Sequence, residues 1–138
     1  MKKQMFSLLG LSLMLATVSA YGQTVRVKAN IPFNFSVTGA TLPAGAYTIQ
    51  PLTSDGRVLS IRDSDMKAQG MVLATRCESL NDAKQTKLVF HRYGDRYFLT
   101  QIWVAGRNSG HQIPKSRRET EMAKDYTMQE VLLVAALH

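Results

Sequence analysis

The residue types best suited to bind a ligand are gathered in one basic segment, which spans positions 107–118 and contains no acidic residue. Its cationic or titratable side chains are Arg107, His111, Lys115, Arg117 and Arg118, and Trp103 comes shortly before it. Guanidinium groups bind carboxylates and phosphates through paired hydrogen bonds. This set therefore predicts a site for a sugar acid, a phosphate or a peptide carboxylate. A solvated loop is the simpler alternative, because runs of charge usually face water.

A second group of reactive side chains consists of His91, Tyr93 and Asp95. A histidine beside a tyrosine and a carboxylate could transfer protons. Strand alternation puts His91 and Tyr93 on one face, however, whereas Asp95 falls in a Gly-Asp turn, where aspartate has a structural role. We therefore expect no catalytic residue here. A small periplasmic hydrolase or isomerase with a site near His91 or His111 stays open as an alternative.

No motif for a cofactor or a metal is present in the sequence. The three histidines, His91, His111 and His138, are far apart, and Cys77 is the single cysteine, so the close spacing typical of metal sites is missing. Phosphate-binding loops, dinucleotide fingerprints and the nucleophile elbow of hydrolases are missing as well. We expect no cofactor and no metal, and Cys77 can form no internal disulfide.

The first 20 residues have the features of a secretory signal peptide. Lys2 and Lys3 precede an uncharged, apolar stretch that ends at Val18 and Ala20, the two positions that signal peptidase recognises. The apolar core is shorter than the roughly 20 residues of a membrane span, so we expect cleavage rather than a retained anchor. Residues 21–138 would then form one domain of a secreted or periplasmic protein.

The mature chain shows the short alternating segments of β-strands. The clearest alternation runs from Val25 to Val37 and puts the odd-numbered residues in the core, with Pro32 marking an edge or a bulge in one bent strand or two collinear ones. Further strands are expected at 46–52, 58–62 and 70–75. Asp55-Gly56 predicts a two-residue hairpin turn between the first two of these. Residues 77–85 and 105–110 are interpreted as loops.

A second hairpin is expected over residues 86–104. A turn at Gly94-Asp95 pairs Tyr93 with Arg96 and His91 with Phe98. Strict alternation would put Ile102 on the face of Tyr93, opposite the face that carries Leu88. Both faces are largely apolar, so we expect this hairpin to be central in its sheet, with a short helix or loop covering the second face.

The last third of the chain predicts one helix and one strand. Ser116 and Glu119 have the spacing of a capping box, which indicates a helix from Arg117 to about Lys124. The apolar run at 131–137 favours a buried strand, and a helix that begins at Met128 stays open as the alternative. The expected fold is all-β: an antiparallel sandwich or a partly closed barrel with one short helix.

Three blocks of the mature chain resemble a family of small secreted β-rich proteins from soil bacteria. They are NIPF at positions 30–33 followed by LPAG at 42–45, KLVFHRYGD at 87–95, and PKSRRE at 114–119. The family has no established activity, so the resemblance implies export and assigns no role to any residue.

The charge of the chain indicates the kind of partner. The 17 basic and 10 acidic residues leave a positive balance even without the two N-terminal lysines. This favours weak attraction to an anionic glycan or another envelope component, and the excess is too small for a nucleic-acid partner. We expect a non-catalytic binding or envelope-associated module. A self-associating structural subunit is a third alternative, against which proline-bearing edges argue.

Overall fold

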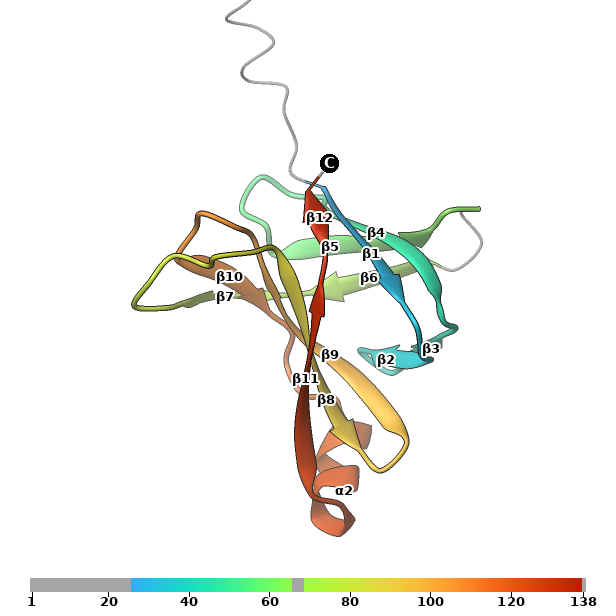
Figure 1. The fold of residues 1–138 in the computed structure, drawn as a ribbon. Helices are drawn as coiled ribbons and strands as arrows, with labels where there is room; N and C mark the ends of the chain where they lie inside the picture. Colours follow the sequence, from blue (N-terminus) through green and yellow to red (C-terminus); the bar gives the residue numbers. More distant parts are fainter. Residues whose placement is uncertain (1–25, 66–68, 138) are drawn as a thin grey trace, which may run out of the picture.

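The computed structural model describes residues 26–65 and 69–137, and it confirms the predicted all-β fold (Figure 1). Two mostly antiparallel sheets pack into a β-sandwich, and one short helix, α2, lies at one end. The predicted signal peptide is outside the described residues, as are Val25 and His138. No helix in the described part of the chain is long and apolar enough to cross a membrane.

The first sheet has five strands. In spatial order they are β12 (Ala136–Leu137), β1 (Val27–Ile31), β4 (Gly45–Pro51), β5 (Val58–Asp63) and β6 (Gln69–Leu73). All neighbours are antiparallel. The alternation predicted for this region is confirmed, because Val27, Ala29 and Ile31 are buried and the residues between them are exposed.

The second sheet has seven strands. Five of them follow the order β11 (Met128–Val134), β8 (Lys87–Tyr93), β9 (Arg96–Trp103), β10 (Ser109–Gln112) and β7 (Thr75–Glu78). The other two are β2 (Phe35–Val37), which pairs in parallel with β9, and its hairpin partner β3 (Ala40–Leu42). Because β1 and β2 belong to different sheets, Pro32 marks the passage from one sheet to the other rather than a bend within one strand.

Two of the segments of chain that pass from one sheet to the other join the layers at corners that backbone hydrogen bonds fix. One runs from β6 through Ala74 into β7, and the Ala74 amide donates to the Arg57 carbonyl at 2.8 Å. The other runs from β11 through Ala135 into β12, and the Ala135 amide donates to the Thr86 carbonyl at 2.9 Å. Strands that switch sheets in this way are typical corners of sandwiches. They put residues from both sheets around one cleft.

The central hairpin of β8 and β9 has the predicted register near its turn, where Tyr93 pairs with Arg96 and His91 with Phe98. A β-bulge then interrupts the alternation, because Leu99 pairs with Phe90 but Gln101 pairs with Val89. The extra residue is Thr100, whose hydroxyl donates to the Val89 carbonyl. The predicted face of Ile102 was therefore wrong: this side chain lies opposite Leu88 and is buried in the main core.

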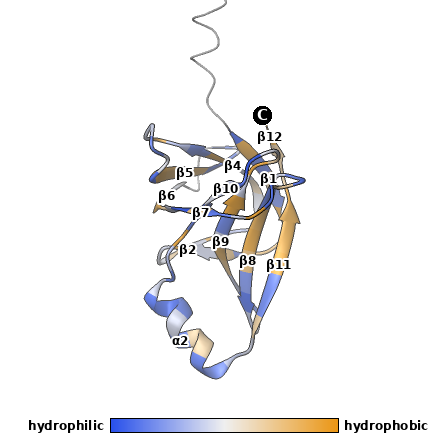
Figure 2. Ribbon diagram, turned by 90° about the vertical axis from the view of Figure 1, so that its left-hand side faces the viewer, coloured by the Kyte–Doolittle hydropathy of each residue, from blue (hydrophilic) through white to orange (hydrophobic). Residues whose placement is uncertain are grey.

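Helix α2 (Arg117–Asp125) confirms the predicted helix and covers part of the second face of this hairpin. Ser116 caps it, since its hydroxyl accepts from the Glu119 amide at 3.1 Å. The Glu119 carboxylate does not complete the capping box. It turns towards the sheet instead, where Glu119 is only 2% exposed. Most of the remaining helix surface is hydrophilic (Figure 2).

Three other sequence expectations need correction. The loop predicted from Cys77 is strand β7 up to Glu78, and the loop predicted up to Gly110 ends where β10 begins, at Ser109. The sequence of β10, Ser-Gly-His-Gln, has little strand propensity, so its pairing with β9 and β7 makes it a strand. The C-terminal run is extended, as predicted, but it divides at Ala135 into β11 and β12, which belong to different sheets. Strand β11 is an edge strand whose Leu132 and Val134 are exposed rather than buried.

Candidate binding site

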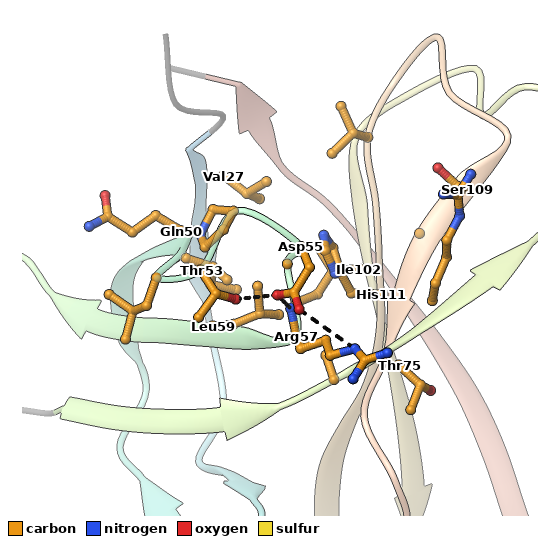
Figure 3. Close-up of a pocket in the computed structure, with 18 of the residues that line it drawn as sticks. Val27, Gln50, Thr53, Asp55, Arg57, Leu59, Thr75, Ile102, Ser109 and His111 are labelled. Atoms are coloured by element: carbon orange, nitrogen blue, oxygen red, sulfur yellow. Dashed lines mark hydrogen bonds and ion pairs between the residues drawn. The ribbon is translucent and has the colours of Figure 1, made fainter. Parts of the chain in front are cut away.

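A cleft of about 1070 Å³ lies between the two sheets (Figure 3). Its walls come from the ends of β1, β4, β7 and β9, from β10 and from two loops. Apolar side chains that are buried in the core form its base: Val27, Ile49, Leu59, Ile102 and Val104. Its charged or titratable residues are Asp55, Arg57, Arg76, Arg107 and His111. Three guanidinium groups against one carboxylate give the cleft a positive charge.

The β4–β5 connection forms one side of the cleft. It is longer than the predicted two-residue turn, because Pro51 pairs with Leu59 and the Leu52 amide donates to the Val58 carbonyl at 2.8 Å. Within it, Asp55 Oδ1 accepts from the Thr53 hydroxyl at 2.6 Å and from the Arg57 amide at 3.1 Å. These two bonds, the Thr53 hydroxyl first, lower the pKa of the Asp55 carboxyl group, so the loop holds a stable carboxylate.

This loop reaches the second sheet at His111, on β10. Gly56 has a φ of +71°, and a Cβ atom there would lie 2.8 Å from His111 Cε1, so only glycine allows this approach. Burial lowers the pKa of His111, and the positive charge of Arg107 acts in the same direction, while a hydrogen bond with the Gly56 backbone opposes them. At neutral pH we therefore expect a neutral imidazole.

Arg107 lies in the loop between β9 and β10 of the second sheet, and backbone hydrogen bonds hold it in place. Its amide donates to the Val104 carbonyl at 3.2 Å, and its carbonyl accepts from the Ala83 amide at 2.8 Å. The Gly106 amide in turn donates a hydrogen bond to the Ala83 carbonyl at 2.9 Å. The loop is thus fixed, but no carboxylate within residues 26–65 and 69–137 forms an ion pair with the Arg107 side chain. This guanidinium is available to a ligand.

The other two cleft arginines have acidic neighbours. Arg57 Nε lies 3.7 Å from Asp55 Oδ2, and Arg76 Nε lies 3.5 Å from Glu78 Oε1. All four side chains are more than half exposed, so these pairs contribute little to stability and can rearrange around an anion.

The structure brings together only two of the six residues predicted as a binding site, Arg107 and His111. Trp103 packs over Gly110 on the neighbouring strand, and its Nε1 donates to Gln101 at 3.0 Å. The other three are Lys115, Arg117 and Arg118, which lie at the start of α2 and do not line the cleft. Sequence reasoning missed Arg57 and Arg76, because only the folding of distant strands brings them to the cleft.

His91 does meet an acid, but outside the cleft. Its Nδ1 lies 3.4 Å from Glu119 Oε2, which also accepts a hydrogen bond from the Tyr93 hydroxyl at 3.0 Å. Burial first, and then Glu119, raise the pKa of Tyr93 to about 12. Because Glu119 belongs to α2 while His91 and Tyr93 belong to β8, these contacts attach the helix to the sheet.

A metal site or a known relative would indicate which class of function the protein has. In the described part of the chain, no three histidine, cysteine, aspartate or glutamate side chains gather closely enough to hold a metal ion. Comparisons with protein-family models, with curated proteins and with solved structures give no match. The case for a function therefore depends on the geometry of the cleft.

Proposed function

We propose that the protein is an exported, non-catalytic binding module that holds a carboxylate or phosphate ligand in the cleft between its two sheets. The observation that carries this proposal is the Arg107 side chain, which has no ion-pair partner among the described residues and lies on a loop fixed by backbone hydrogen bonds. A positioned guanidinium binds such anions at little cost in ordering.

The other groups of the cleft suit the same ligand. Arg57 and Arg76 add charge, and the neutral His111 ring can exchange a hydrogen bond with a sugar hydroxyl. A general base needs a reacting proton within reach and a group that orients it. The orienting contact of His111 is the Gly56 backbone rather than a carboxylate, which favours binding over catalysis.

Export is part of the proposal and is supported by the N-terminal sequence. The charged start, the apolar core and the small residues at Val18 and Ala20 are typical of a cleaved signal peptide. A secreted or periplasmic location would expose the cleft to glycans and other envelope components.

The proposal is tested by thermal melting of the purified protein with D-glucuronate, inorganic phosphate and, as the neutral match, D-glucose. A ligand of the folded state raises Tm with increasing concentration. We expect a rise with at least one anion and none with glucose. Arg107→Ala should abolish the rise, whereas Arg118→Ala, which removes the same charge outside the cleft, should keep it. Equal responses of the two variants, or no rise with either anion, would refute the proposal.

Self-association is a second candidate function, because edge strand β6 exposes two large apolar side chains. Met71 is 73% exposed and Leu73 is 67% exposed. Such an edge can pair with another copy of the chain. Sedimentation over a range of concentrations tests this. Growth in size that Leu73→Lys prevents would support it, and a constant monomer would exclude it.

A further inference from the structure

The outer face of the first sheet carries a second positively charged surface, separate from the cleft. Lys28, Thr48 and Arg62 lie in register on β1, β4 and β5, so their side chains form one row across the strands. A shallow hollow of about 710 Å³ runs over this face. Arg26 comes just before β1, and it lines the same surface hollow as Lys28. The charged row therefore lies in a concave surface.

The spacing of the cations follows from the sheet. Lys28 and Arg62 are separated by one strand, which puts their backbones about 10 Å apart. Arg26 lies two residues before Lys28, about 7 Å away in an extended chain. These spacings spread the positive charges over the face, which suits an extended ligand with repeated negative charges.

The carboxylates that the structure describes do not pair with this row of cations. Among the described residues, none forms an ion pair with Arg26, Lys28 or Arg62. Asp63 borders the hollow at the end of β5, but it pairs with Tyr47 across the strands, and cross-strand partners share a face. Since Tyr47 is buried in the core, Asp63 belongs to the core side, where burial first, and then the charge of Asp63, raise the pKa of Tyr47.

The uncharged groups on the face distinguish between polyanions. Asn30, Thr48 and Gln50 offer amides and a hydroxyl, which can exchange hydrogen bonds with sugar hydroxyls. Sheets that bind single-stranded nucleic acid present aromatic side chains on which bases stack. Tyr47 is the one aromatic residue among those lining the hollow, and its ring is buried on the other side of the sheet.

We infer that this face, formed by Arg26, Lys28, Thr48 and Arg62, binds an acidic polysaccharide whose chain runs across the strands of the first sheet. The cations contact its carboxylates, and the neighbouring amides and hydroxyls contact its sugar hydroxyls. This inference does not depend on the cleft, because none of these four residues lines it.

Calorimetric titration of the purified protein with polygalacturonate tests the inference, with dextran as the neutral polymer and polyuridylate as the nucleic-acid polymer. We expect binding of polygalacturonate at about 20 mM salt that weakens at least about tenfold at about 200 mM, because contacts with exposed charges are screened. Dextran should not bind, and polyuridylate should bind more weakly than polygalacturonate.

Matched variants locate the site. The double substitution Lys28→Gln/Arg62→Gln should weaken polygalacturonate binding about tenfold or more, whereas Arg117→Gln/Arg118→Gln, with the same loss of charge on α2, should change it by less than about twofold. Melting curves check that all variants fold. Equal losses in both double variants, tighter binding of polyuridylate or no binding of polygalacturonate would each overturn the inference.

Discussion

Replacing Tyr93 by phenylalanine should destabilise the protein strongly, although it removes a single oxygen atom. The Tyr93 hydroxyl donates to Glu119 Oε2 at 3.0 Å, and Glu119 is only 2% exposed, so water cannot easily replace this donor. A hydrogen bond to a charged group contributes about 1.5–3 kcal/mol. For a domain of this size, about 4 °C per kcal/mol converts this cost to a fall in Tm of roughly 6–12 °C. Calorimetric or denaturant unfolding measures it.

Tyr97→Phe is the matched control for this substitution. Tyr97 is half-buried, stacks on Phe33 with ring centroids 3.7 Å apart, and its hydroxyl makes no hydrogen bond among the described residues. Its loss should change the free energy of unfolding by less than about 0.5 kcal/mol. If Tyr93→Phe cost no more than Tyr97→Phe, the attachment of α2 through Glu119 would be refuted.

Three further predictions concern pH and packing. The pKa of Tyr93 rises from 10.0 to about 12 on folding, so the unfolded chain loses the hydroxyl proton at lower pH than the folded protein does. The free energy of unfolding should therefore fall as pH rises from 10 to about 12, and it should fall less in Tyr93→Phe. The lowered pKa of His111 gives the opposite pH dependence of stability: the contribution of His111 to stability is complete above the ordinary pKa of 6.5 and is lost as pH falls through the pKa of the folded state. The substitution His111→Gln should therefore make the free energy of unfolding depend less on pH in acid. In unfolding experiments, Gly110→Ala should lower the free energy of unfolding by about 2–3 kcal/mol, because the new Cβ would lie 2.7 Å from the Ile102 carbonyl oxygen. Gly39→Ala should lower it by about 1 kcal/mol, because the space around Gly39 is open and only its φ of +83° is unfavourable for alanine.

Local patterns predicted the elements whose register a turn or a cap determines. Gly94 has the positive φ that the turn requires, and the pairing of Tyr93 with Arg96 follows from it. The Ser116 cap likewise determined where α2 begins. These features depend on residues that are close in the sequence, so the local sequence is enough to predict them.

Features that depend on distant partners were not predictable in the same way. The bulge at Thr100 reverses the face of Ile102, and nothing in the local alternation marks it. Strand β10 exists because β9 and β7 flank it. The prediction of the binding site was incomplete for the same reason. Arg107 and His111 lie close in the sequence, whereas Arg57 and Arg76 reach the cleft only through the corner of β6 and β7.

The central claim is that an anionic ligand occupies the cleft, and amide chemical-shift mapping on titration with D-glucuronate tests it most directly. We predict saturable shifts that are largest at Gly56, Arg107 and His111, which line the cleft from both sheets. Shifts confined to Arg117 and its neighbours on α2, or none at saturating glucuronate and phosphate, would contradict the account.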